Sequence, residues 1–322
     1  MTNVKAIFIV SEGTLRNEKK EISEYTIELI KKLDSRGIHI VITTGLPRFL
    51  SRDISLKANA SRYLISSNGA DIYDTLKGEN IKSSYIDQEI IKEIYNLSNK
   101  DYNLILGIGE YEYSNLKNEY NLKAKSITDI NKLNEGVYQV HLSQRKFEVT
   151  SDNYQLEMIK FIRDYDIEKL KLLIGNSLCF KVINNLSLTK EELEIVVRAI
   201  RYLKLFSLKS EILRKYNEFI GVGNQSIDFY KFQIDGEIPW FSLNKKGVSK
   251  GMAIKYLCNY LNIDINETIG IGNDYNDKSM IGTVGTFICP SNAREFIKSE
   301  TDVLCRNNEG VNKILKMVYE KR

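Results

Sequence analysis

The chain opens on an apolar run that stops abruptly in a polar turn, and this boundary constrains the fold more than any other stretch. Residues 4–10 are almost entirely apolar, and the next four residues are Ser11, Glu12, Gly13 and Thr14. A continuous apolar run of this length is typical of a strand buried on both faces of a sheet. The sequence therefore predicts a buried strand that delivers polar residues at its carboxyl end.

A helix and a second apolar strand follow, so the chain begins as a βαβ unit. Ser23 is a typical N-cap residue, and Gly37 is a typical left-handed helix stop. Between them, apolar residues recur at the spacing of one helix face: Ile27, Ile30 and Leu33. The second strand, predicted over residues 38–42, leads into Thr43, Thr44 and Gly45, at the sheet edge where α/β folds bind their ligands.

The middle of the chain follows a different pattern, which predicts a second domain inserted into the first. We expect an inserted α+β domain over residues 82–240, with the first domain formed by residues 1–81 and 241–322. The predicted helices span residues 88–97, 154–164 and 188–205. The predicted strands span residues 104–108, 136–143, 170–174, 179–183 and 226–234.

The last part of the chain returns to alternating helices and strands. Lys250 begins an amphipathic helix, and the strand predicted over residues 268–271 ends in a turn rich in Asn and Asp. Strands over residues 286–289 and 302–305 and a terminal helix from Gly310 complete the predicted parallel sheet.

Four stretches, in order along the chain, resemble the motifs of the haloacid dehalogenase (HAD) phosphatases, in particular their Cof-type branch. Residues 10–15 resemble that family's Asp-x-Asp-Gly-Thr-Leu, and residues 44–47 its Thr-Gly-Arg-Pro. Residues 247–251 read Gly-Val-Ser-Lys-Gly as in the family, and residues 272–277 resemble Gly-Asp-x-x-Asn-Asp. The resemblance implies an α/β fold in which a Rossmann-like parallel-sheet HAD core carries an inserted α+β cap domain.

The chain departs from the family at its two catalytic aspartates. In HAD phosphatases the first Asp attacks phosphorus and the second is the general acid/base, and here Val10 and Glu12 occupy those positions. A valine side chain has no lone pair with which to attack. In a regular strand Ser11 points away from the face shared by residues 10 and 12, so we do not expect it to replace the nucleophile.

The resemblance also implies the remaining site residues. Glu12 and Lys250 are the expected catalytic residues. The expected phosphate-binding residues are Glu12, Gly13, Thr44, Gly45 and Lys250. Asn273, Asp274 and Asp277 are the expected metal ligands, and without a carboxylate at residue 10 they leave at best a weak Mg²⁺ site.

Composition excludes several other classes of function. The net charge of +4 comes from 46 basic and 42 acidic residues without a long run of one sign, which indicates neither nucleic acid nor a membrane surface as a partner. No apolar run approaches the length of a membrane span, and no signal peptide opens the chain, so we expect a cytoplasmic protein. Four widely spaced cysteines indicate free thiols.

Three functions remain open on the sequence. The leading one is a phosphatase homologue that binds a small phosphorylated metabolite, such as a sugar phosphate, but has lost efficient hydrolysis. The second is an active Mg²⁺-dependent phosphatase with an unusual nucleophile. The third is a non-catalytic module with a vestigial pocket that binds a protein partner.

Overall fold

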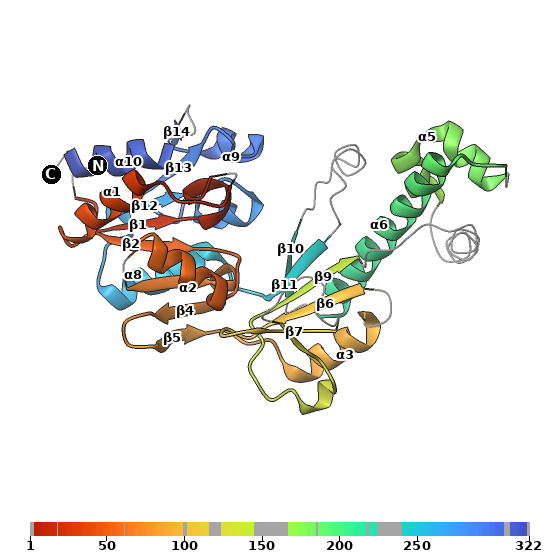
Figure 1. Cartoon of the computed structure of the whole chain (residues 1–322), viewed down its shortest axis with the longest axis horizontal. Helices are drawn as coiled ribbons and strands as arrows, with labels where there is room; N and C mark the ends of the chain where they lie inside the picture. The colour runs from red at the N-terminus through yellow and green to blue at the C-terminus, as the bar shows by residue number, and fades with distance from the viewer. Residues whose placement is uncertain are drawn as a thin grey trace. The chain divides into compact units, whose positions relative to one another are not determined.

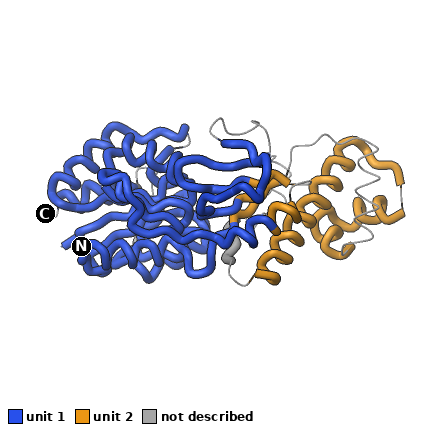
Figure 2. The backbone as a smooth tube through the Cα atoms, turned by 90° about the horizontal axis from the view of Figure 1, so that it is seen from below, with its two compact units in different colours: residues 1–92, 105–140, 243–322 blue, residues 93–104, 141–242 orange. Residues whose placement is uncertain are grey.

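The structure is a computed structural model, and it separates the chain into two compact units. It describes residues 3–17, 19–60, 62–98, 102–115, 124–144, 167–184, 186–216, 219–223, 240–305 and 310–320. The first unit comprises residues 1–92, 105–140 and 243–322, and the second comprises residues 93–104 and 141–242 (Figure 2). The domain limits predicted from the sequence, at residues 82 and 240, stay a prediction.

The first unit contains an eight-stranded sheet in the order β14-β13-β12-β1-β2-β3-β4-β5 (Figure 1). The first six strands of this order run parallel, whereas β4 and β5 are antiparallel additions at one edge. The strand bounds are β1 (Ala6–Ile9), β2 (His39–Thr43), β3 (Tyr63–Ser66), β4 (Asp71–Asp74), β5 (Glu79–Ser83), β12 (Thr268–Ile271), β13 (Thr286–Pro290) and β14 (Val303–Cys305). The predicted parallel sheet is therefore confirmed.

Helices cover both faces of this sheet because its central strands are buried on both faces. The helices are α1 (Glu24–Asp34), α2 (Arg48–Lys57), α8 (Lys250–Leu261), α9 (Glu295–Glu300) and α10 (Gly310–Glu320). Ile7 and Ile9 of β1 pack in one apolar cluster with residues of α1, α2 and α10. Phe8 and Val10 pack in another, with residues of α8 and α9. This alternation follows the two-residue repeat of a strand.

Helix α1 forms as its sequence predicts. The Ser23 hydroxyl accepts a hydrogen bond from the Thr26 amide at 3.2 Å, which caps the helix. Ile30 and Leu33 of the predicted apolar face are buried against the sheet together with Leu29, whereas Ile27 is only half-buried. After the helix, Gly37 has the positive φ of +76° that allows the chain to turn back into β2.

A six-stranded sheet has the order β10-β11-β9-β6-β7-β8. Its strands are β6 (Tyr102–Gly107), β7 (Glu112–Ser114), β8 (Ala124–Ser126), β9 (Gln139–Gln144), β10 (Phe219–Gly223) and β11 (Trp240–Lys245). The other helices are α3 (Gln88–Ser98), α5 (Ile167–Ile183) and α6 (Lys190–Lys215). The capping box that begins α6 is formed, since Thr189 and Glu192 exchange hydrogen bonds. None of the helices described is both long and apolar enough to cross a membrane.

Two predicted strands are wrong. Residues 170–174 and 179–183 both lie in helix α5, which is interrupted at Gly175 (φ +79°, ψ 164°). The interruption leaves two short apolar pieces, and periodicity alone cannot separate a short buried helix from a strand. Packing decides the outcome here, because Leu170 and Val182 are buried against α6. The predicted helix over residues 154–164 and the predicted strand over residues 226–234 lie outside the described residues.

Candidate functional site

The first strand ends at Ile9, and residues 11–15 form a wide helical turn. The Leu15 amide donates to the Val10 carbonyl at 3.1 Å, and the Arg16 amide donates to the Ser11 carbonyl at 3.0 Å. Gly13 has a φ of +67°, and a Cβ atom there would lie 2.4 Å from Nδ2 of Asn273. The turn therefore requires glycine both for its backbone conformation and for its close approach to the neighbouring segment.

Val10 occupies the position of the attacking carboxylate in the family motif, and it is an ordinary core residue. Its side chain is 4% exposed and lies in the apolar cluster with Phe8, Val41 and Ala253. It continues the alternation of β1, with its side chain on the face covered by α8. This side chain can neither attack phosphorus nor bind a metal.

The expectation that Ser11 points away from the face shared by residues 10 and 12 is wrong with respect to Glu12. The Ser11 hydroxyl is hydrogen-bonded to the Glu12 carboxylate and lies 3.0 Å from the Thr44 hydroxyl. The expectation assumed that strand alternation continues through residue 12, whereas the strand has ended and the turn brings neighbouring side chains to the same place. The Ser-Glu pair after an apolar strand was visible in the sequence, but its geometry depends on where the strand stops.

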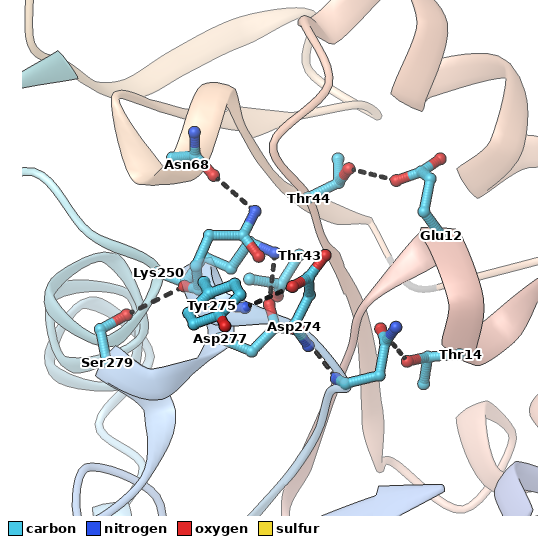
Figure 3. A network of polar contacts seen from close by, with 12 residues as sticks. Glu12, Thr14, Thr43, Thr44, Asn68, Lys250, Asp274, Tyr275, Asp277 and Ser279 are labelled. Carbon is cyan, nitrogen blue, oxygen red and sulfur yellow. Dashed lines mark hydrogen bonds and ion pairs between the residues drawn. The ribbon is translucent and has the colours of Figure 1, made fainter. Parts of the chain in front are cut away.

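Glu12 and Thr44 meet at the edge of the sheet (Figure 3). The Thr44 hydroxyl donates to Oε2 of Glu12 at 3.0 Å and accepts a hydrogen bond from the Leu46 amide at 3.1 Å. Oε1 of Glu12 lies 3.6 Å from Nη1 of Arg16. Thr44 is completely buried, whereas the Glu12 side chain is 47% exposed. The Glu12 carboxylate thus covers the buried threonine.

The loop after β3 joins this group to the last motif. Asn68 has a left-handed φ of +58°, and its amide donates to the Thr44 carbonyl at 3.0 Å. Its side-chain oxygen accepts a hydrogen bond from Nδ2 of Asn276 at 3.0 Å. A Cβ atom at Gly45 would lie 2.9 Å from the same Asn68 oxygen, so any larger residue there would displace the Asn68 side chain. The role of Asn68 in linking Thr44 to Asn276 was not predicted, although an Asn-Gly pair is typical of a left-handed backbone conformation.

Lys250 and Asp277 form a buried ion pair. Lys250 begins α8, which Ser249 caps by accepting from the Met252 amide at 3.2 Å. The Lys250 ammonium donates to Oδ1 of Asp277 at 2.5 Å, with the two side chains 1% and 0% exposed. This ammonium contacts Asp277 rather than the pair of Glu12 and Thr44, and it retains further N–H groups that can be donated to an anion.

The remaining oxygen of Asp277 holds the turn that contains it. Oδ2 accepts hydrogen bonds from the backbone amides of Asn273 and Asp274, at 2.8 and 2.9 Å. Both carboxylate oxygens of Asp277 are therefore engaged within the protein.

The other two predicted metal ligands are also engaged. Oδ1 of Asp274 accepts hydrogen bonds from the Tyr275 amide at 2.8 Å and from Nε of Arg294 at 3.2 Å. Oδ1 of Asn273 accepts from the Thr14 hydroxyl at 2.9 Å. Among the described residues, no group of three or more His, Cys, Asp and Glu side chains could hold a metal ion. Mg²⁺ usually takes one or two carboxylates together with waters and substrate phosphate oxygens, and the hydrogen bonds already made by Asp274 and Asp277 leave a poor set of donors for it.

Hydrogen bonds join the four motif segments to one another (Figure 3). Thr14 contacts Asn273, Thr44 contacts Glu12, and Lys250 contacts Asp277. The structure thus assembles the polar residues at the ends of the strands predicted to carry them. The catalytic, phosphate-binding and metal-binding roles assigned to these residues stay predictions.

Comparison with known proteins agrees with this arrangement. Residues 12–317 match the family described as haloacid dehalogenase-like hydrolase. Phosphatase YwpJ of Bacillus subtilis (strain 168) is 26% identical over 315 residues, which cover 95% of this chain and 96% of that protein. A phosphoglycolate phosphatase of Methanobrevibacter smithii is 24% identical over 316 residues, which cover 96% and 94% of the two chains.

Solved structures share the fold. A haloacid dehalogenase-like hydrolase from Bacteroides thetaiotaomicron matches with a TM-score of 0.69 at 17% identity, over 98% of this chain and 99% of that one. The HAD subclass IIB sugar phosphatase BT4131 matches with a TM-score of 0.63 at 18% identity, over 98% of each chain. The family match, the motif order and the shared fold lead to one conclusion: the chain belongs to the haloacid dehalogenase-like hydrolases.

Proposed function

We propose that this protein binds a small phosphorylated metabolite, such as a sugar phosphate, and does not hydrolyse it efficiently. The observation that carries the proposal is Val10, an apolar core residue at the position where the family motif has its attacking Asp. Phosphatases of this family split a very slow hydrolysis into two steps through an aspartyl-phosphate. Without a carboxylate at residue 10, that intermediate cannot form on this strand.

Phosphate binding does not depend on that carboxylate. The Thr44 hydroxyl, the Lys250 ammonium and the backbone amides of the turn at residues 11–15 are groups that suit a phosphate dianion. An apolar residue 10 also removes a negative charge that would repel the dianion. Support for a phosphorylated ligand comes from the relatives, which include proteins named as phosphatases and a phosphoglycolate phosphatase.

Glu12 is poorly placed for the second catalytic role as well. It is one methylene longer than the family's Asp, and an error of about 1 Å in position can cost on the order of a hundredfold in rate. Its carboxylate is also held by Thr44. Both departures in the first motif thus lower turnover while leaving the phosphate-binding donors in place.

Binding is expected without Mg²⁺. In an active family member the metal offsets the repulsion between the nucleophilic carboxylate and the phosphate. With valine in that position there is no carboxylate whose repulsion a metal must offset. Because Asp277 is paired with Lys250, the site is also less able to hold a metal. A weak effect of Mg²⁺ on the affinity for phosphate agrees with this proposal, whereas phosphate binding that requires Mg²⁺ would contradict it.

Isothermal titration calorimetry with a panel of sugar phosphates, in EDTA and in Mg²⁺, tests the proposal. We expect binding in EDTA that Thr44→Val weakens, and no release of inorganic phosphate from the bound compounds. Thr26→Val is a matched control, because Thr26 is also buried and also donates one side-chain hydrogen bond, to Asn312 at 2.6 Å. Binding that vanishes in EDTA would contradict the proposal, and no binding under either condition would favour a protein-interaction module.

One observation favours a second candidate, an active phosphatase with a serine nucleophile. The Ser11 hydroxyl is hydrogen-bonded to the Glu12 carboxylate, which could accept its proton. The Ser11 oxygen would then attack phosphorus, the ester bond to the leaving group would break, and Glu12 would pass the proton to the departing oxygen. Water would later cleave the phosphoserine. The complete burial of Ser11 disfavours such an attack, and mass spectrometry for phosphoserine 11 after incubation with p-nitrophenyl phosphate decides it.

A further inference from the structure

The Glu12 carboxylate occupies the hydrogen-bond donors to which a phosphate would have to bind. Oε2 accepts from the Thr44 hydroxyl at 3.0 Å and from the Ser11 hydroxyl. Oε1 faces the Arg16 guanidinium at 3.6 Å. A carboxylate between two hydroxyl donors and a cation has the environment that proteins offer to a phosphoryl oxygen.

Counting protons shows that these donors cannot serve both groups at once. A threonine hydroxyl has a single proton, and the hydroxyl oxygen of Thr44 already accepts from the Leu46 amide at 3.1 Å. Its proton is therefore directed at Glu12. Ser11 also has one hydroxyl proton, which it can donate to the same carboxylate or to the Thr44 hydroxyl oxygen 3.0 Å away. A phosphate oxygen can receive either proton only after Glu12 has left.

Arg16 supplies an independent indication of an anion site. Its side chain is only 15% exposed, and its Nε atom is buried without a hydrogen-bond partner among the described residues. Buried guanidinium N–H groups normally have acceptors. Glu12 reaches only Nη1 of this group, and at a distance beyond a hydrogen bond. A larger anion with several oxygens could satisfy it more fully.

Glu12 is also the one member of this group that can readily move. Its side chain is 47% exposed, whereas Ser11 and Thr44 are completely buried. Two anions cannot share these donors, because a carboxylate and a phosphate dianion repel each other at contact distance. The Ser11 and Thr44 hydroxyls are thus fixed in the protein interior, whereas the Glu12 side chain that accepts from them is partly exposed to solvent.

We propose that the Glu12 carboxylate is an internal competitor for the phosphoryl group, and that Ser11, Thr44 and Arg16 bind a phosphate oxygen only once Glu12 has swung into solvent. The proposal rests on the proposed phosphate-binding function and assigns Ser11 and Arg16 to its site. Affinity for phosphate is then reduced by the fraction of molecules in which Glu12 occupies the donors. Replacing Glu12 should therefore tighten binding, the reverse of what removal of a ligand-binding residue does.

Calorimetry with inorganic phosphate in EDTA tests this prediction on the full chain. We expect Glu12→Ala to bind phosphate about tenfold more tightly than the wild type, because in the variant no carboxylate occupies the hydroxyl donors. Glu12→Gln, which keeps the length but loses the charge, should fall between the two. The matched control is Glu21→Ala, which removes the same charge from another exposed side chain and should bind like the wild type.

Further variants identify the donors. In the Glu12→Ala background, Ser11→Ala and Arg16→Gln should each reverse most of the gain. Circular dichroism establishes that each variant is folded, and Glu12→Gln provides a conservative second measurement should Glu12→Ala be unstable.

The outcomes separate this proposal from the function on which it rests. If the wild type binds phosphate, Thr44→Val abolishes binding, and neither Glu12 variant binds more tightly, the competitor proposal is wrong and the proposed function stands. If neither the wild type nor the Glu12 variants bind phosphate or sugar phosphates, both are wrong. Tighter binding by Glu12→Ala than by the wild type, reversed by Ser11→Ala, would support the competitor, whereas binding by Glu12→Ala with none by the wild type would support the competitor and overturn the proposed function.

Discussion

Lys250 and Asp277 are the most deeply buried charges of the site, with side chains 1% and 0% exposed. Removing two charges from water is costly, and their mutual attraction offsets that cost only when the remaining hydrogen bonds are satisfied. Asp277 meets this condition, because its other oxygen accepts two backbone amides. The pair therefore positions the ammonium and at the same time holds the last motif in its turn.

Lys250→Met should destabilise the protein strongly. It leaves the Asp277 carboxylate buried without its cation, which typically costs about 3–5 kcal/mol. Urea denaturation measures the free energy of unfolding. The matched control is Lys278→Met, which breaks the exposed pair with Glu300 and should cost below about 1 kcal/mol. If both variants lost the same free energy of unfolding, the buried pair would contribute no more to stability than the exposed one.

At the same scale, Val10→Asp combined with Glu12→Asp should create measurable Mg²⁺-dependent phosphatase activity, and each change alone should do much less. The first change supplies an attacking carboxylate and a metal ligand, and the second restores the shorter acid. Because both groups act on one transition state, their effects should be strongly non-additive.

The test is hydrolysis of p-nitrophenyl phosphate by the two single variants and the double variant, after circular dichroism has shown that each is folded. A folded double variant that binds Mg²⁺ and hydrolyses nothing above background would show that the site has diverged beyond these two positions.

At the scale of elements, the turn at residues 11–15 depends on Gly13 in two separable ways. Its φ of +67° is costly for any residue with a Cβ, and that Cβ would also collide with the Asn273 side chain at 2.4 Å. Gly37, which follows α1, has a similar φ of +76° but no atom within 4 Å of a Cβ placed there. The two glycines can therefore be compared directly, because they share a positive φ and only at Gly13 would an added Cβ meet a described side chain.

Gly37→Ala should therefore cost about 1–2 kcal/mol through its backbone conformation alone. Gly13→Ala should cost more, typically by about another 1–3 kcal/mol, because Asn273 must move. Gly13→Ala should also lose phosphate binding while Gly37→Ala retains it. Urea denaturation and calorimetry measure the two effects, and equal losses of stability and of binding in both variants would contradict this account of the turn.

In the second unit, His141 of β9 stacks on Trp240 of β11 with ring centroids 5.0 Å apart, and its Nδ1 lies 3.1 Å from the Ser242 hydroxyl. Burial lowers the pKa of His141 from its usual 6.5 to about 4. The folded protein thus resists a proton that the unfolded chain accepts. Below the unfolded pKa, this difference destabilises the folded state increasingly as the pH falls toward about 4.

Trp240 is the only tryptophan in the chain, so its fluorescence reports this titration directly. We expect a change in emission with a midpoint near pH 4, and none in His141→Gln. The stability of His141→Gln should also depend less on pH between about 4 and 6.5 than that of the wild type. A midpoint near the usual value of 6.5 would show that the imidazole is solvated.

At the scale of the whole molecule, sequence reasoning was most accurate where the chain is most deeply buried. The strand predicted over residues 268–271 is β12, because a strand covered on both faces is a continuous apolar run between polar turns. Three of the four motif segments could be placed for the same reason, since they follow β1, β2 and β12. Accuracy fell in α5, where Gly175 divides the helix into pieces too short to show a helical period.

The places of the motif residues in the fold could be predicted, whereas their mutual contacts could be predicted only in part. Thr44, Lys250 and Asp277 follow from motif positions at strand ends and at a helix start. The engagement of Asp277 by Lys250 and the position of Ser11 beside Glu12 depend on the path of the backbone through two turns. The Lys250–Asp277 contact joins two separate segments, and the Ser11–Glu12 contact depends on where the first strand ends, so no local pattern encodes either.

The central claim is that this protein binds phosphate esters without turning them over. Phosphorus-31 NMR of glucose 6-phosphate mixed with stoichiometric protein reports both events in one sample. We predict that the ester resonance broadens or shifts on addition of protein in EDTA, and that Thr44→Val weakens this response. In Mg²⁺ the ester resonance should persist overnight, with inorganic phosphate appearing no faster than in the sample without protein. A growing inorganic phosphate resonance in the wild-type sample would contradict the claim.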